Sequence, residues 1–170
     1  MEILWSPWRS QYIGSFKDDS INDEGCFFCN AIKNPEKDID LLVVARFEHC
    51  FAILNKFPYN NGHTLIAPLR HIGDLQDLSE IEMIDIMKAI KIVSAGLDAI
   101  YKPHGFNIGA NLGRAAGAGV PDHLHFHVIP RWNGDTSFTA TISDTKVVSV
   151  SLVDTQRELS NVIRNMNNNE

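Results

Sequence analysis

Cysteine is scarce in this chain, and the odd number present, three, argues against the disulfide framework of a small secreted protein. The chain also lacks a long apolar run, since no unbroken run is longer than that at residues 41–45, which is far too short to span a bilayer. The acidic Glu2 and the Pro7 in the first apolar stretch are not typical of a signal peptide. We therefore expect a cytoplasmic protein without a membrane partner.

Runs of basic residues are absent as well. The 170 residues include 15 Lys and Arg against 21 Asp and Glu, which gives a net charge of −6. Proteins that bind the nucleic-acid backbone normally present a basic surface, so nucleic acid is not an expected partner. The length and the 44% share of hydrophobic residues are typical of one ordinary globular domain.

The hydrophobic pattern predicts an α+β fold. Short runs rich in Val, Ile, Leu and Phe predict strands at 41–45, 49–54, 63–69, 106–112 and 124–130. Ser79 followed by Glu82 is a capping box, and apolar residues at helical spacing after it, among them Ile81, Ile84 and Met87, predict a long helix with an apolar core-facing stripe. A second amphipathic helix is expected at 152–164. We expect an antiparallel sheet of about five strands, with the long helix across it and a C-terminal helix.

The most informative stretch is 123–130, in which three histidines alternate with apolar residues. His123, His125 and His127 would share one face of a strand, while the residues between them would enter the core. Such a row predicts a functional site rather than a packing device. It could bind a metal, or it could transfer a phosphoryl or nucleotidyl group with one imidazole as nucleophile and a neighbour as proton donor. The glycines of the preceding segment, 113–121, favour the transfer chemistry, because they let backbone N–H groups approach a phosphate.

Cys26 and Cys29 form a close pair. In a cytosolic protein such a pair is usually a redox couple or half of a zinc site. Two reduced, buried cysteines are the simpler alternative.

With these motifs the chain resembles the histidine triad (HIT) family of nucleotide hydrolases and transferases. The resemblance rests on three blocks: the alternating row at 123–129, the sequence GHTLIAP at 62–68, and residues 107–113. The flanks at 5–9 and 116–123 are similar to the bacterial branch of diadenosine tetraphosphate phosphorylases and ATP adenylyltransferases. The resemblance implies a single HIT-type domain over 1–170, with an N-terminal arm at 1–25, a HIT core at 26–132 and a C-terminal extension at 133–170.

The resemblance also implies roles for three histidines. His125 would be the nucleophile that attacks the α-phosphate and forms a nucleotidyl-imidazole intermediate. This role requires a backbone carbonyl that holds one ring nitrogen protonated, and a neutral imidazole is available near neutral pH. His127 would contact the scissile phosphate and give a proton to the leaving oxygen, and His63 would lie behind the row.

Four further positions are implied to bind the nucleotide. Asn55 matches a ribose-binding position, and Asn111 an amide near the transferring phosphate, while Gly117 and Gly119 would approach the phosphate. The loop after Asn111 is one residue longer than in most members. Counter-charges for a polyphosphate could come from Lys56, Arg114 and Arg131, and Trp8 and Arg9 could cover the base or pack on a partner subunit.

Zinc-containing members of the family imply a structural zinc site here, formed by Cys26, Cys29, His71 and His123. By spacing alone, His49 and His104 are rivals for the fourth position. Mg²⁺ is expected only as a companion of the nucleotide substrate. The family also implies a homodimer, or a higher homo-oligomer, with the long helix in the interface.

The expected function is cleavage of a dinucleoside polyphosphate, such as diadenosine tetraphosphate, at the α-phosphate. His127 is more usual in hydrolases, but the flanking motifs favour phosphorolysis, in which inorganic phosphate accepts the nucleotidyl group. The alternatives are a hydrolase of dinucleoside polyphosphates or of nucleoside phosphoramidates, a His-rich metalloenzyme, and a nucleotide-binding module.

Overall fold

The computed structural model describes residues 25–135 and 149–168. The predicted N-terminal arm, with Trp8 and Arg9, therefore lies outside the described residues. So does the middle of the predicted C-terminal extension.

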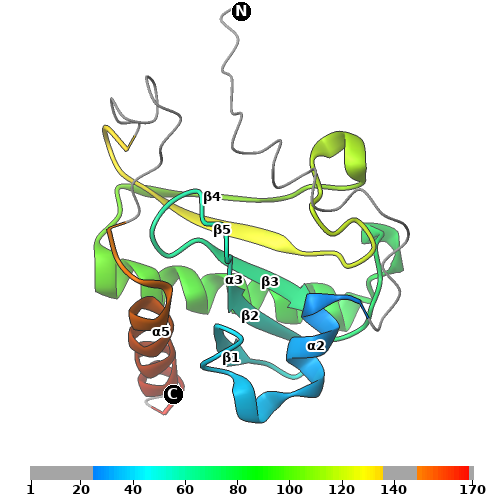
Figure 1. Ribbon diagram of the computed structural model, residues 1–170, viewed down its shortest axis with the longest axis horizontal. Helices are drawn as coiled ribbons and strands as arrows, with labels where there is room; N and C mark the ends of the chain where they lie inside the picture. The colour runs from blue at the N-terminus through cyan, green and yellow to red at the C-terminus, as the bar shows by residue number, and fades with distance from the viewer. Residues whose placement is uncertain (1–24, 136–148, 169–170) are drawn as a thin grey trace, which may run out of the picture.

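The described strands form one antiparallel sheet, ordered β1-β2-β3-β5-β4 (Figure 1). They are β1 (Val43–Arg46), β2 (Cys50–Leu54), β3 (Thr64–Pro68), β4 (Gly105–Ala110) and β5 (Phe126–Arg131). The predicted α+β fold with five strands is confirmed. The structure places β5, which contains His127, the last histidine of the row, between β3 and β4 rather than at an edge of the sheet.

The prediction was wrong about where the histidine strand begins. It begins at Phe126, so His123 and His125 lie in the segment just before it. The reason is a change of hydrogen-bonding partner, since the backbone N–H of Leu124 donates to the carbonyl of Ile72 in a loop rather than to a neighbouring strand. The apolar residues of the row still face the core, with Leu124 and Val128 almost completely buried.

The long helix α3 (Glu80–Tyr101) crosses one face of the sheet (Figure 1). It begins with the predicted capping box, in which Ser79 and Glu82 satisfy each other's backbone N–H groups. Its buried face includes Ile86, Val93 and Leu97, which belong to the same core cluster as Val128.

The predicted core stripe of this helix was wrong at its first residues. Ile81, Ile84 and Met87 are each more than half exposed, at 56%, 55% and 62%. The helical spacing is present, but the sheet packs against the neighbouring row of the helix, which includes Ile86 and Val93. Hydrophobic periodicity cannot tell which of two apolar rows faces the sheet.

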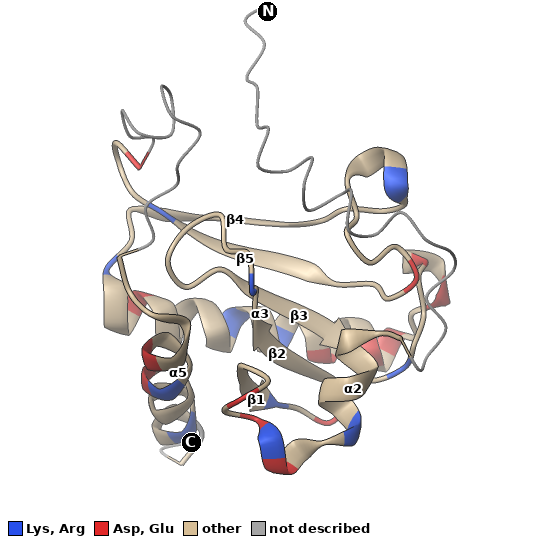
Figure 2. Ribbon diagram, in the orientation of Figure 1, with Lys and Arg blue, Asp and Glu red and all other residues tan. Residues whose placement is uncertain are grey.

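The C-terminal helix α5 (Leu152–Asn167) packs on α3 and β1. Its Leu159 and Ile163 enter the core, and Gly96 of α3 allows this approach, because a Cβ there would lie 2.8 Å from Leu159. Figure 2 shows acidic and basic residues interspersed along α5. No helix among the described residues is long and apolar enough to cross a membrane.

The short helix α2 (Phe27–Lys33) covers the other face of the sheet, where a second apolar cluster forms around Phe28 and Phe51. Three 3-10 turns complete the described elements: η1 (Pro35–Lys37), η2 (Leu75–Asp77) and η3 (Arg114–Ala116). His127 pairs in register with Leu65 of this second cluster, so the histidine row lies on the same side of the sheet as α2.

Candidate active site

Three imidazoles lie in contact at the junction of β3 and β5. The ring centroids of His125 and His127 are 5.1 Å apart, and those of His63 and His127 are also 5.1 Å apart. All three side chains are buried, with relative exposures of 6%, 9% and 1% for His125, His127 and His63. The structure therefore brings together the three histidines that the resemblance singled out.

His125 has one ring nitrogen held by the backbone. Its Nδ1 lies 2.9 Å from the carbonyl oxygen of His123. Because a carbonyl only accepts, Nδ1 carries the proton and the lone pair is on Nε2. Burial lowers the pKa of His125, although the bond to the carbonyl acts in the opposite direction. The result is a neutral imidazole with a nucleophilic nitrogen.

His63 is held in the opposite tautomer. The backbone N–H of Tyr59 donates to its Nδ1 at 3.1 Å, and Nδ2 of Asn55 lies 3.4 Å from the same atom. Nδ1 is therefore an acceptor, and the proton of the neutral ring is on Nε2. Burial, followed by the neighbouring His127 and His125, lowers the pKa of His63 from 6.5 to about 3.

This tautomer determines that of His127. Nε2 of His63 lies 2.9 Å from Nδ1 of His127 and donates to it. Neutral His127 must then carry its own proton on Nε2. The site thus pairs an unprotonated nitrogen on His125 with a protonated nitrogen on His127, the arrangement that nucleophilic attack with assistance to a leaving group requires.

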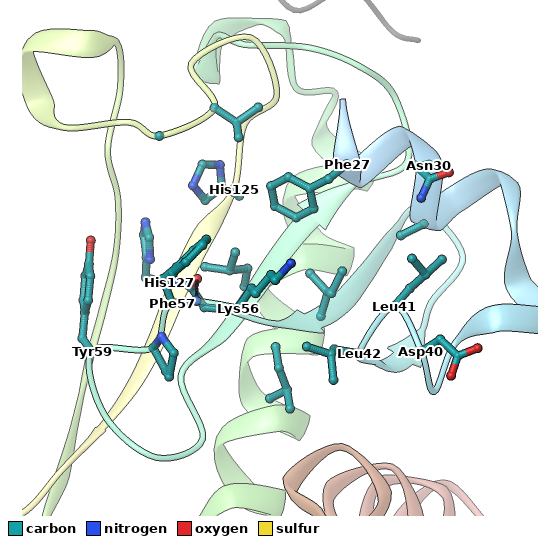
Figure 3. A pocket seen from close by; sticks show the side chains of 18 of the residues that line it. Phe27, Asn30, Asp40, Leu41, Leu42, Lys56, Phe57, Tyr59, His125 and His127 are labelled. Atoms are coloured by element: carbon teal, nitrogen blue, oxygen red, sulfur yellow. Dashed lines mark hydrogen bonds between the residues drawn. The ribbon is translucent and has the colours of Figure 1, made fainter. Parts of the chain in front are cut away.

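A cavity of about 660 Å³ opens beside the two histidines (Figure 3). This volume is typical of small-molecule sites. In Figure 3, His125 and His127 lie at one end of the cavity and Asn30 and Asp40 at the other. The walls between these ends are largely apolar, and the residues that form them include Phe27, Leu41, Leu42, Ile53 and Val120.

Most of the predicted nucleotide-binding positions line this cavity, namely Asn55, Gly117, Gly119 and His127. Asn111 is not among its lining residues; its Nδ2 lies 3.5 Å from the carbonyl of Gly117 and so braces the loop. Of the three candidate counter-charges, Lys56 lines the cavity, whereas Arg131 is paired with Asp135.

The apolar wall was missed by sequence reasoning. Phe27, Leu41 and Leu42 are distant from the histidine row in sequence, and apolar residues in a helix or strand are ordinarily read as core. The available signal was Phe27 beside the cysteine pair, because adjacent helical residues point about 100° apart and the two rings of a short helix need not both face the core. Phe28 is fully buried, and Phe27 is 42% exposed.

The second cluster of functional groups consists of Cys26, Cys29, His71 and His123, which each offer one ligand atom within 4.8 Å of the others. Three of the four sulfur–nitrogen distances lie between 3.2 and 3.5 Å. Zn–S bonds of about 2.3 Å and Zn–N bonds of about 2.0 Å at a tetrahedral angle place sulfur and nitrogen about 3.5 Å apart. The four side chains therefore fit a tetrahedral metal ion.

The surroundings of the cluster agree with this assignment. Nε2 of His123 donates to the carbonyl of Pro68 at 3.0 Å, which leaves Nδ1 to face the sulfurs. The rival His49 lies beside Glu48, and Nδ1 of His104 accepts from the N–H of Asn133. Neither rival belongs to the cluster, so His71 is the fourth member.

Phe28 lies between the cysteine–histidine cluster and the histidine row. Its side chain has no exposure, and its ring centroid lies 4.9 Å from that of His123 and 5.1 Å from that of His125. A metal that fixes the flanking cysteines would also fix this ring against His125.

The chain resembles known proteins in sequence and in structure. The family model for the HIT domain matches residues 36–134. An AP-4-A phosphorylase of Mycobacterium tuberculosis is 38% identical over 167 residues, which cover 94% of this chain and 83% of that protein. An adenosine 5'-monophosphoramidase of Schizosaccharomyces pombe is 33% identical over 108 residues, or 64% of this chain and 75% of that protein.

A solved structure shares the fold over most of its length. It is a Zn-bound histidine triad family protein from Mycobacterium smegmatis, which aligns with a TM-score of 0.71 and 26% identity over 88% of this chain and 100% of that one. The family match and the level of identity agree with the geometry of the histidine row. The chain therefore belongs to the HIT family and is an enzyme of the nucleotidyltransferase or hydrolase type.

Proposed function

We propose that this enzyme cleaves dinucleoside polyphosphates at an α-phosphate by transferring the nucleotidyl group to Nε2 of His125. The observation that carries the proposal is the hydrogen bond from Nδ1 of His125 to the carbonyl of His123, which directs the lone pair of Nε2 away from the backbone. The adjoining cavity has apolar walls suited to a nucleoside, and two glycines of the loop, Gly117 and Gly119, line it, where backbone N–H groups could approach a phosphate.

The proposed reaction has two displacements. In the first, Nε2 of His125 forms a bond to the α-phosphorus, and the bond from that phosphorus to the bridging oxygen breaks. The N–H at Nε2 of His127 donates a hydrogen bond to the departing oxygen and so stabilises its charge. Diadenosine tetraphosphate would give adenylyl-His125 and ATP at this stage.

In the second displacement, an acceptor oxygen attacks the α-phosphorus and His125 departs. We propose that the acceptor is inorganic phosphate, so that the products are ADP and ATP. The 38% identity to the mycobacterial AP-4-A phosphorylase over nearly the whole chain supports this choice. If water were the acceptor, the products would be AMP and ATP.

Product analysis tests both steps. Purified protein is incubated with diadenosine tetraphosphate and Mg²⁺, with and without inorganic phosphate. ADP plus ATP formed only with phosphate supports phosphorolysis, and AMP plus ATP in both conditions identifies a hydrolase. The His125→Ala variant should be inactive. Mass spectrometry of native protein quenched rapidly in alkali, where a phosphorus–nitrogen bond to histidine survives, should find the adenylyl group on His125.

A second candidate function is hydrolysis of nucleoside phosphoramidates, which the 33% identity to the fission-yeast phosphoramidase favours. The same nucleophile and the same proton donor would serve both reactions. Turnover of adenosine 5'-phosphoramidate that exceeds turnover of diadenosine tetraphosphate at equal concentration would favour this candidate.

We also propose that the ion held by Cys26, Cys29, His71 and His123 is zinc in a structural role. Four protein ligands leave no open coordination position for chemistry. The site would tie α2 to the segment before β5 and thereby hold Phe28 against His125. Within the described residues no other group of three or more Cys, His, Asp or Glu could hold a metal, so Mg²⁺ would arrive with the polyphosphate.

A homodimer is proposed from the exposed apolar face of α3. Ile81, Ile84 and Met87 are exposed on one helix side, and such a face is typical of a protein–protein interface. Light scattering should give twice the mass of the chain, and Ile84→Glu should shift the protein toward a monomer. The cytoplasmic location also remains a proposal, based on the cysteine content.

A further inference from the structure

A buried amide connects the loop before β3 to the end of β5. The side chain of Asn60 is 7% exposed. Its Nδ2 donates to Oδ2 of Asp135 at 2.8 Å and to the carbonyl of Pro130 at 3.1 Å. Both hydrogens of the amide are therefore used, and they hold residue 60 against a segment 70 to 75 positions away in the sequence.

The acceptor of this contact is itself rigidly held. Arg131 donates to both carboxylate oxygens of Asp135, with Nε to Oδ2 at 2.6 Å and a terminal nitrogen to Oδ1 at 2.9 Å. The N–H of Trp132 lies 3.3 Å from Oδ2. These donors hold the pKa of Asp135 far below its ordinary value, and the hydrogen bonds from Arg131 make the largest contribution. The carboxylate is therefore charged throughout the physiological pH range. We call Asn60, Arg131 and Asp135 the latch.

The loop that the latch holds is the one that determines the tautomer of His63. The carbonyl of Asn60 accepts from the backbone N–H of His63 at 3.2 Å. The N–H of the preceding residue, Tyr59, donates to Nδ1 of the His63 ring. Displacement of Asn60 would therefore move the nearer of the two donors that keep Nδ1 of His63 unprotonated, the other being Nδ2 of Asn55 at 3.4 Å.

The consequence extends to His127. If Nδ1 of His63 were protonated, its Nε2 would become an acceptor, and the hydrogen bond to His127 would have to reverse. Nδ1 of His127 would then carry the proton, and its Nε2 would have none to offer to a leaving oxygen. The two tautomers of a neutral imidazole differ little in energy, so a fixed backbone donor is what selects between them.

We propose that Asn60 and Asp135 are positioning residues which, through Tyr59 and His63, keep the proton of His127 on Nε2 and so make His127 a donor to the leaving group. This inference rests on the proposed function for its catalytic meaning. The tautomer itself can be observed without any substrate.

The first test is nitrogen NMR of protein labelled with ¹⁵N-histidine. Correlations between ring nitrogens and ring hydrogens distinguish a protonated Nε2 from a protonated Nδ1. The native protein should show His127 protonated on Nε2, and Asn60→Ala should show a mixture or the reverse tautomer. A His127 tautomer that is unchanged in Asn60→Ala overturns the inference, whatever the enzyme does.

The second test measures sensitivity to the leaving group, using p-nitrophenyl and phenyl esters of AMP. Phenolate is the more basic leaving group, with a pKa near that of tyrosine, about 10. Asn60→Ala should lower kcat on the phenyl ester by roughly tenfold or more, since positioned proton donors contribute about 10² to 10⁴ in rate. The loss on the p-nitrophenyl ester should be no more than about one third as large. Equal losses on both esters overturn the inference.

Asp135 offers a matched pair of variants. Asp135→Asn and Asp135→Ala both remove the ion pair with Arg131, but only Asn retains an oxygen that can accept from Asn60. Asp135→Asn should therefore recover much of the native preference for the Nε2 tautomer, and Asp135→Ala should resemble Asn60→Ala. If the two variants behave alike, the ion pair rather than the contact with Asn60 is responsible and the inference is wrong.

Glu82→Gln controls for destabilisation alone, because Glu82 pairs with Arg70 and does not line the cavity. The ratio of its kcat values on the phenyl and p-nitrophenyl esters should equal that of the native protein. If the native protein releases neither phenol, the proposed function fails, while the NMR result still decides the inference about the tautomer.

Discussion

Nε2 of His63 lies 2.9 Å from Nδ1 of His127, a contact that joins the residue just before β3 to β5. Because the N–H of Tyr59 occupies the other nitrogen of His63, this contact has a direction. It places the proton of neutral His127 on Nε2, and His127 lines the cavity.

Substitution of His63 should therefore lower turnover in a way that depends on the replacement. His63→Leu removes the donor to His127 and should lower kcat on diadenosine tetraphosphate by about 10- to 100-fold. His63→Gln can place an amide N–H near the position of Nε2 and should retain more activity. Steady-state kinetics on both variants, with thermal unfolding as the check on folding, measures the difference. Equal losses would contradict a role for the hydrogen bond.

Phe27 should contribute to binding rather than to chemistry. Its ring lines the cavity, with its centroid 4.0 Å from that of Phe28, and under the proposed function it would stack on a base. Loss of base stacking costs about 1–3 kcal/mol, so Phe27→Ala should raise KM roughly tenfold. The value of kcat should stay within about twofold, and Phe27→Leu should show a smaller rise in KM. A loss confined to kcat would show that the ring serves another purpose.

Removal of the metal should affect stability and activity together. The cluster joins α2 to the segment before β5, so Cys29→Ser should abolish stoichiometric zinc and lower Tm by roughly 10 °C. Cys50→Ala is the matched control, since Cys50 is buried but lies outside the cluster. Metal analysis and calorimetry provide the measurements. Full zinc content in Cys29→Ser would exclude the proposed ligand set.

Glu82 in the first turn of α3 should make the free energy of unfolding depend on pH in the acid range. Arg70, followed by the contacts with Ser79, lowers the pKa of Glu82 from 4.5 to about 2. A carboxyl group whose pKa is lower in the folded state stabilises fully above its unfolded pKa, and this stabilisation is lost as pH falls through the folded pKa. The free energy of unfolding of the native protein should thus exceed that of Glu82→Gln by about 1–2 kcal/mol at pH 7. Urea titrations between pH 6 and pH 2 should show this difference shrink, whereas a constant difference would mean that the charge of Glu82 does not matter.

Local patterns were sufficient for much of the fold. The capping box at Ser79 and Glu82 defines the start of α3 because both partners lie within one helical turn. The alternation at 123–128 indicates which side chains enter the core, and Leu124 and Val128 are buried although the strand itself begins only at Phe126. The exposed row containing Ile84 could not be distinguished from the buried one containing Ile86, because both are apolar.

The sequence by itself therefore determined the fold class, the family and the histidines that can carry the chemistry. The resemblance implied His71 as the fourth member of the cysteine–histidine cluster, but spacing left His49 and His104 as rivals, and only the tertiary structure separated them from it. Only the tertiary structure decided, too, that Asn60 reaches Asp135. It also placed the apolar cavity wall that includes Phe27 beside the histidine row. The physical reason is the same in each case: a strand or helix pattern specifies which face a residue occupies, but the partner across space depends on how loops far apart in sequence pack together. Proton positions on His63 and His127 depend on those packed neighbours, and so they are properties of the folded molecule.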